Sequence, residues 1–289
     1  MSPENTSIFS VIIPAYNEEK GIVEVLDNLK FLDANYEIIV VDDGSVDKTS
    51  EAVRKYANVR LITHSRNSGY GASLKTGIKH SSGDIIIITD ADSTYPVERI
   101  PEFVSILADN DFDMVVGART GENVNIPPIR KPAKWMISRL ANYLAGINIP
   151  DLNSGFRIIK KEAVKNFISI LPNGYSFTTT ITLAMTTNAY NVKYVPINYL
   201  KRTGKSKIRP IKDTLNFIQL IVRTTLYFDP LKIFIPVSLA MFGASFLVFI
   251  YSYFFIPTLM DTTVAIFFIS GIQILAIGMV ADLINRKMK

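Results

Sequence analysis

The amino-acid sequence predicts an α/β fold with a doubly wound, mostly parallel sheet, followed by an apolar helical hairpin. Three observations lead to this prediction. Short β-branched runs alternate with segments of helical apolar spacing over about the first 200 residues. Polar residues follow the ends of several of these runs. The last quarter of the 289-residue chain is far more apolar than the rest.

The individual elements follow from apolar periodicity. Strands are expected over residues 9–13, 36–41, 59–63, 85–89, 113–117, 158–159 and 193–199. Helices are expected over residues 19–32, 47–56, 96–108, 134–147 and 175–189, and from the glycine loop at 67–71 to about residue 79. Because strands joined by helices form parallel crossovers, their carboxyl ends meet at one edge of the sheet, where ligands bind.

The amino-acid composition excludes some kinds of metal site and suggests which partners the protein binds. The chain has no cysteine and two histidines, which argues against a disulfide framework, a thiolate metal site and a multi-histidine metal centre. A net charge of +5 fits nucleic acid, an anionic membrane surface or a phosphorylated substrate as a partner. Residues 10–14 form too short an apolar run for a signal peptide and are expected to belong to the first strand.

Acidic residues stand at the end of the fourth expected strand. Where the chain turns there, Asp90 and Asp92 can point to one place, and their oxygens suit a divalent cation held against a diphosphate. The alternative is that the Asp-x-Asp sequence only caps a turn. Residues 14–18, residues 42–43 and Arg119 are expected at the same edge of the sheet. This convergence favours a metal–diphosphate site.

The carboxyl-terminal quarter is typical of a membrane hairpin. Residues 233–256 contain no charge and residues 264–284 are nearly as apolar, so each segment is long enough to span a bilayer. The alternative is a pair of buried core helices. Lys232 and the basic residues of 286–289 flank the hairpin, and the positive-inside rule places both chain ends in the cytoplasm. Residues 211–228 are expected to form an amphipathic helix in the membrane interface.

Several short motifs, taken together, resemble a known family. They are PAYNE at 14–18, VVDDGS at 40–45, DAD at 90–92, GAR at 117–119, SGFR at 154–157 and GKSK at 204–207. This set resembles glycosyltransferase family 2 with the GT-A fold. More narrowly, it is similar to the polyprenyl-phosphate glycosyltransferases related to dolichyl-phosphate mannose synthase, in the branch with two transmembrane helices per subunit. The resemblance implies a GT-A domain over residues 1–210, a juxtamembrane helix over 211–230 and a transmembrane hairpin over 231–289.

The resemblance also implies roles for donor-binding residues. The loop that holds the base and ribose is Pro14, Ala15, Tyr16 and Glu18, and the nucleotide-binding acid is Asp43. The metal and diphosphate segment is Asp90, Ala91 and Asp92, in which Asp92 is the direct ligand of Mg²⁺ or Mn²⁺. The basic loop that closes over the donor contains Arg202, Lys205 and Lys207.

Thr94 marks a departure from the family pattern. Many dolichyl-phosphate mannose synthases have Gln at this position, two residues after the second Asp of the motif. A Thr hydroxyl is a shorter and weaker ligand for a metal or a water, so Thr94, like Asp90, is a secondary metal-site candidate beside Asp92. The departure counts against mannose as the sugar and GDP as the nucleotide.

Cations are expected to gather where the acceptor binds. In the family, Arg119 is shared between donor and acceptor phosphates, and Lys134 and Ser138 hold the lipid phosphate. Arg139 is a further candidate from its charge, whereas Arg157 is expected to hold the turn at 151–157. A phosphate acceptor is mostly dianionic at neutral pH, so it needs cations more than it needs a general base.

The expected function is therefore a membrane-bound inverting glycosyltransferase. It would move a single sugar from a UDP- or GDP-sugar to a dolichyl or undecaprenyl phosphate in the cell membrane, with its catalytic domain in the cytoplasm. No nucleic-acid partner is expected, and relatives with two membrane helices suggest a homo-oligomer. The alternatives are a polysaccharide synthase that extends a glycan, and a non-enzymatic GT-A scaffold in the membrane.

Overall fold

The computed structural model describes residues 9–120, 139–140, 142–143, 146, 148–198, 210–258 and 260–288. The chain divides into two compact units, Met1–Phe217 and Ile218–Lys289. The first unit contains the sheet and the second contains two long apolar helices.

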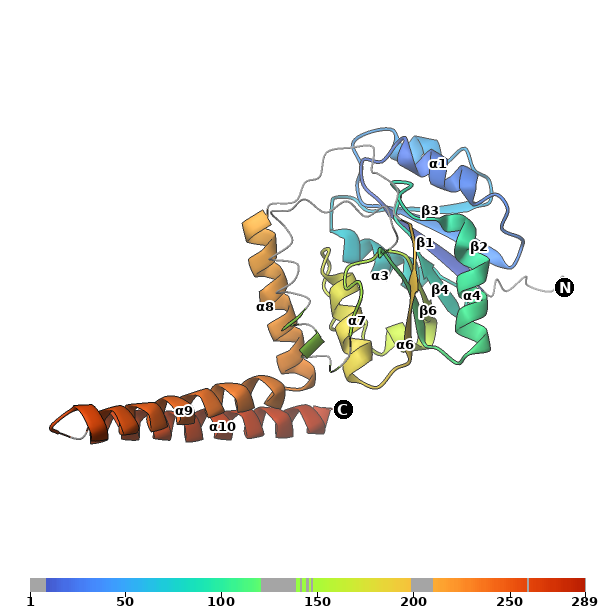
Figure 1. Ribbon diagram of the computed structural model, residues 1–289. Coiled ribbons are helices and arrows are strands. Elements are labelled where there is room, and N and C mark those ends of the chain that lie inside the picture. Colours follow the sequence, from blue (N-terminus) through green and yellow to red (C-terminus); the bar gives the residue numbers. More distant parts are fainter. Residues whose placement is uncertain are drawn as a thin grey trace. The chain divides into compact units, whose positions relative to one another are not determined.

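A seven-stranded sheet with the order β3-β2-β1-β4-β6-β5-β7 forms the centre of the first unit (Figure 1). The strands are β1 (Phe9–Ala15), β2 (Tyr36–Asp42), β3 (Val59–Thr63), β4 (Ile85–Ile88), β5 (Met114–Ala118), β6 (Arg157–Lys160) and β7 (Val192–Pro196). All neighbouring pairs are parallel except those of β6, which runs antiparallel to both β4 and β5. The predicted mostly parallel sheet is confirmed. The reversal of β6 brings its amino end to the edge where the other strands end.

Helices cover both faces of this sheet (Figure 1). They are α1 (Gly21–Asn28), α2 (Thr49–Val53), α3 (Tyr70–His80), the 3₁₀ turn η1 (Val97–Arg99), α4 (Ile100–Asp109), α6 (Lys161–Lys165) and α7 (Phe177–Thr187). Side chains of a strand alternate between faces. Val11 and Ile13 of β1 accordingly join a buried cluster with Ile22 of α1, while Ile12 contacts Gly77 of α3. The core therefore lies on both sides of β1.

Several helices are shorter than predicted, among them α1, α2 (residues 49–53 against 47–56) and α7 (residues 177–187 against 175–189). In the segment 19–32 only α1 is helical: it begins at Gly21, whose backbone lies close to that of Ala91, and it ends at Asn28. The short helix α6, which directly follows β6, was not predicted. Most of the helix predicted over 134–147 lies outside the described residues.

The second unit is a helical hairpin of α9 (Leu231–Phe255) and α10 (Asp261–Met288). Ser238 Oγ donates to Gly271 O at 2.8 Å and Ser245 Oγ to Val264 O at 2.9 Å, so the two helices run antiparallel. Both are long and apolar enough to cross a membrane, with a mean hydropathy of 2.4. The amphipathic helix α8 (Pro210–Phe228) precedes them, and Asn285 Nδ2 donates to the carbonyl of Phe228 at 2.9 Å.

Candidate active site

The candidate site lies along the edge of the sheet where β1, β2, β4 and β5 end. These strands end at Ala15, Asp42, Ile88 and Ala118, and β6 begins at the same edge. Residues 14–18, 42–43, 90–92, 119 and 151–156 therefore follow or precede strand ends on one rim. This is the edge at which open α/β sheets bind ligands.

At the end of β2, Asp43 is buried and fully engaged within the protein. Its carboxylate accepts hydrogen bonds from the backbone N–H of Ser68 at 2.9 Å and of Gly69 at 2.8 Å, and its Oδ1 lies 2.7 Å from His64 Nδ1. A Cβ at Gly69 would lie 2.4 Å from the carbonyl oxygen of Asn173. The glycine loop therefore packs closely against the backbone at Asn173, and its N–H groups hold Asp43 in place.

A second set of hydrogen bonds holds the turn after β2 and ties the loop after β1 to α2. The Asp42 carboxylate accepts from the Ser45 N–H at 2.9 Å and from the Ser50 hydroxyl, so it caps the turn after β2. Glu18 N–H donates to Thr49 Oγ1 at 2.9 Å. Tyr16 is 37% exposed, while Pro14 and Ala15 at the end of β1 are buried.

Asp90 faces the side of the sheet that carries α3. Tyr70 donates its hydroxyl to Asp90 Oδ1 at 2.9 Å. Burial and the neighbouring Asp90 charge raise the pKa of Tyr70 well above its usual value, so the phenol stays protonated and donates. A Cβ at Gly155 would lie 2.8 Å from Asp90 Oδ1, so the absence of a side chain there leaves room for the carboxylate.

Asp92 has different neighbours. Its Oδ1 accepts a hydrogen bond from Thr94 Oγ1 at 2.6 Å, and Thr94 is 1% exposed. Asp92 lines a cavity of about 260 Å³ with residues 17–21 and Asp47. A Cβ at Gly21 would lie 2.4 Å from the Ala91 carbonyl oxygen, so glycine lets this loop approach the Asp-x-Asp segment closely.

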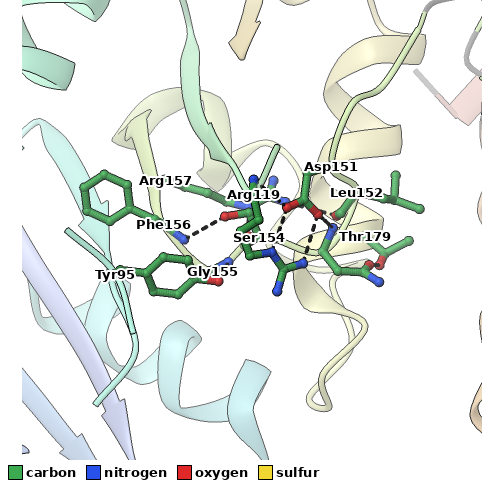
Figure 2. Close-up of polar contacts among 10 residues, drawn as sticks. Tyr95, Arg119, Asp151, Leu152, Ser154, Gly155, Phe156, Arg157 and Thr179 are labelled. Carbon is green, nitrogen blue, oxygen red and sulfur yellow. Dashed lines mark hydrogen bonds and ion pairs between the residues drawn. The ribbon is translucent and has the colours of Figure 1, made fainter. Parts of the chain in front are cut away.

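Arg119 follows β5 and forms an ion pair with Asp151 (Figure 2). Its Nε donates to Asp151 Oδ2 at 2.7 Å and its Nη2 to Oδ1 at 2.9 Å, while its backbone N–H donates to Oδ2 at 3.0 Å. Burial by itself would raise the pKa of Asp151, but the hydrogen bonds and charge of Arg119 outweigh it and lower that pKa. The bidentate pair fixes the plane of the guanidinium.

Arg157 holds the turn that carries Asp151, as predicted. It is fully buried, and it donates to the carbonyl oxygens of Ser154 at 2.7 Å and Leu152 at 3.1 Å (Figure 2). It also donates to Thr182 Oγ1 at 2.6 Å. Desolvation lowers the pKa of Arg157. The network continues outward from Asp151, because Asn153 N–H donates to its Oδ1 at 3.1 Å.

The structure places some of the predicted site residues and leaves others undescribed. Lys134, Ser138, Arg202, Lys205 and Lys207 lie outside the described residues, and Arg139 is exposed. Sequence reasoning assigned no role to Asp151 or Tyr70, which contact Arg119 and Asp90. The signal available for Asp151 was its place at the start of the polar turn before a short strand.

Known proteins resemble this chain in sequence. The model of the family described as glycosyl transferase family 2 matches residues 10–168, and that of the GtrB C-terminal hairpin matches residues 229–286. The dolichyl-phosphate hexose transferase of Haloferax volcanii is 31% identical over 70% of this chain and 86% of that protein. The dolichyl-phosphate beta-glucosyltransferase ALG5C of Trichomonas vaginalis is 30% identical over 73% of this chain and 70% of its own length.

Solved structures share the fold of the first unit. Glucosyl-3-phosphoglycerate synthase from Mycobacterium tuberculosis, in complex with uridine diphosphate, has a TM-score of 0.59 at 20% identity over 76% of this chain and 80% of its own. TarS 1-349 of S. aureus, in complex with UDP-GlcNAc, has a TM-score of 0.57 at 23% identity over 76% of this chain and 67% of its own. This chain thus belongs to glycosyl transferase family 2, with a GT-A domain and a GtrB-type hairpin.

Proposed function

We propose that this chain is a membrane-bound inverting glycosyltransferase that moves one sugar from a UDP- or GDP-sugar to a dolichyl or undecaprenyl phosphate. The observation that carries the proposal is the similarity, over about two thirds of the chain or more, to proteins named as hexose and glucosyl transferases of dolichyl phosphate. The GtrB-type hairpin agrees with a lipid acceptor.

The donor nucleotide binds at the ends of β1 and β2 in this proposal. Pro14, Ala15, Tyr16 and Glu18 form the loop for the base and ribose, and Asp43 is the nucleotide-binding acid. Because Asp43 is held by two backbone N–H groups and His64, its carboxylate is fixed before the donor arrives. The loop that contains Arg202, Lys205 and Lys207 closes over the diphosphate.

Asp92 fits a divalent cation. Carboxylate oxygens are ligands that Mg²⁺ and Mn²⁺ accept, and the residue lines a cavity. In the described part of the chain no group of three or more His, Cys, Asp or Glu side chains gathers for a metal, so diphosphate oxygens would complete its coordination. A bound Mg²⁺ or Mn²⁺ would neutralise the charge that develops on the leaving diphosphate. Asp90 and Thr94 support this segment, since Thr94 donates to Asp92.

The acceptor phosphate binds on the Arg119 side of the rim in this proposal. A phosphate monoester has a second pKa near 6, so it is mostly dianionic at pH 7 and attacks without a general base. The protein must instead hold two anions together. Arg119, oriented by Asp151, would meet this need, with Lys134, Ser138 and Arg139 as further contacts.

Attack of the acceptor oxygen in line with the departing diphosphate inverts the configuration at the anomeric carbon. The product is then a polyprenyl-phosphate sugar of opposite anomeric configuration to the donor. Proton and phosphorus NMR of the isolated glycolipid measures this outcome directly. A product that retains the donor configuration would contradict the single-displacement route.

In this proposal the enzyme lies in the cell membrane, and the apolar hairpin supports that location. We expect α9 and α10 to span it with both chain ends and the catalytic domain in the cytoplasm, because Lys232 and the basic end of α10 flank the hairpin. The amphipathic α8 then lies in the interface, where the acceptor head group is found. A homo-oligomer is part of this proposal. Chemical crosslinking in native membranes would test it.

The proposed function is tested with a donor panel. The full chain in detergent is incubated with UDP- and GDP-sugars and polyprenyl phosphate, with and without Mn²⁺. We expect transfer from one donor, lost in Asp92→Ala and retained in Asp84→Ala. Asp84 is a matched control, since it is an exposed acid just before β4 at the opposite edge of the sheet. Equal activity of the two variants, or no transfer from any donor, would count against the proposal.

A further inference from the structure

An exposed aromatic side chain stands beside the candidate site. Tyr175, just before α7, is 79% exposed, and its ring is stacked on that of Tyr70 with centroids 5.7 Å apart and planes at 22°. Tyr70 in turn donates its hydroxyl to Asp90 at 2.9 Å. The two rings therefore form a continuous stack that leads from the surface to a carboxylate of the rim.

The segment that carries Tyr175 is held firmly against α3. The Asn173 carbonyl accepts from Ala72 N–H at 3.0 Å, and its side-chain oxygen accepts from Lys75 Nζ at 3.0 Å. A Cβ at Gly71 would lie 2.2 Å from the carbonyl oxygen of Pro172, so a glycine is required for this contact. The exposed ring is thus fixed in place by the backbone that precedes it.

The position of Asp90 along the rim indicates what such a ring meets. Asp90 follows β4, which lies between β1 and β6, and it contacts Gly155 just before β6. The proposed nucleotide loops follow β1 and β2, and Arg119 follows β5. A group that passes from the donor diphosphate to an acceptor held at Arg119 must cross the rim at this point. The transferred group is the sugar.

The chemistry of the stack suits a hexose ring. One face of a hexose presents C–H groups, which pack on the electron-rich face of an aromatic ring, while its hydroxyls reach a nearby carboxylate. We propose that Tyr175, supported by Tyr70, contacts the hexose of the nucleotide-sugar and is a specificity-determining residue for the donor. This inference rests on the proposed function, because it assumes a nucleotide-sugar donor at this rim.

Binding measurements separate the sugar from the nucleotide. Calorimetry on the full chain in detergent compares the nucleotide-sugar selected by the donor panel with the corresponding nucleoside diphosphate. We expect Tyr175→Ala to weaken nucleotide-sugar binding by about tenfold or more and to leave nucleoside diphosphate binding unchanged. Tyr175→Phe, which keeps the ring face, should bind both like the wild type. Phe31→Ala, at a residue 50% exposed near the opposite edge of the sheet, is the matched control and should change neither.

The other outcomes overturn the inference in distinct ways. Equal weakening of nucleoside diphosphate binding would make Tyr175 a contact of the base, and an unchanged Tyr175→Ala would remove it from the site. A rise in KM for polyprenyl phosphate alone would make it an acceptor contact. A wild-type chain that binds a nucleotide-sugar without transferring it refutes the proposed function and leaves this binding test valid. A chain that binds none of the donors refutes both.

Discussion

The ion pair of Arg119 and Asp151 gives the sharpest prediction. Replacing Asp151 by Asn keeps the size of the side chain but removes its charge and replaces one of the two oxygens that accept from Arg119. Asp151 is 8% exposed and Arg119 is 25% exposed in their side chains. Removing one partner of a buried ion pair costs about 3–5 kcal/mol. Because water reaches Arg119, we expect the unfolding free energy to fall by an amount near the lower end of this range, about 3 kcal/mol.

The effect on catalysis follows from the position of the guanidinium. Once Asp151 no longer fixes it, Arg119 samples several orientations, and a misplacement of about 1 Å at a charged group costs about a hundredfold in rate. We therefore expect Asp151→Asn to lower kcat/KM for sugar transfer by about a hundredfold. Unfolding by denaturant and transfer of radiolabelled sugar to polyprenyl phosphate measure the two losses on the same preparation.

A double-mutant cycle shows whether Asp151 acts through Arg119. If it does, Arg119→Ala and Asp151→Asn each lower kcat/KM, and the double variant is little worse than Arg119→Ala alone. Losses that multiply would refute the reasoning, because Asp151 would then have a role separate from orienting Arg119. Full activity of Asp151→Asn would refute it as well.

Three further predictions concern the same rim. Gly155→Ala places a Cβ 2.8 Å from Asp90 Oδ1, so sugar transfer should fall by about tenfold or more and the unfolding free energy by about 1–3 kcal/mol. Gly174→Ala is the control: a Cβ there has nothing within 4 Å, so neither sugar transfer nor unfolding free energy should change. Arg157→Met leaves buried carbonyls unsatisfied and should lower the unfolding free energy by about 3 kcal/mol, and an unchanged denaturation midpoint would contradict this. Because the pKa of Asp151 is lowered by folding, its stabilisation is complete above its unfolded pKa of about 3.9 and is lost as pH falls below it. The stability difference between wild type and Asp151→Asn should therefore shrink in that acid range, and a constant difference would show that the charge is not its source.

Local apolar patterns in the sequence predicted the strands and the edge of the sheet at which the candidate site residues gather. The strand over residues 59–63 occurs with the same bounds, as β3, and the residues that follow β1, β2, β4 and β5 reach one edge as expected. These predictions rest on β-branched runs and on the rule that parallel strands end at a common edge, both of which act within short stretches of chain. The apolar hairpin was predictable for a similar reason, because the length and composition of α9 and α10 are local properties.

The sequence pattern did not predict the direction of β6. A strand of four residues carries no sign of whether it runs parallel or antiparallel to its neighbours. Its reversal decides which residues meet, because it brings Asp151, rather than the residues after Lys160, to the edge that holds Arg119. The contact joins residues 32 positions apart. It depends on tertiary packing, and it could be inferred only once the sheet order was known.

Asp90 and Asp92 belong to one sequence motif, but tertiary packing gives their carboxylates different neighbours. Residues two apart in a strand lie on the same face, so a strand continued through the motif would present both carboxylates alike. β4 instead ends at Ile88, and a left-handed residue, Ser93 at φ 58°, turns the chain so that Thr94 reaches back to Asp92. Asp90 then meets Tyr70, while Asp92 faces the cavity beside the β1 loop. In the proposed function, Asp92 beside the cavity would therefore meet the cation and the diphosphate, and Asp90 would meet the transferred sugar.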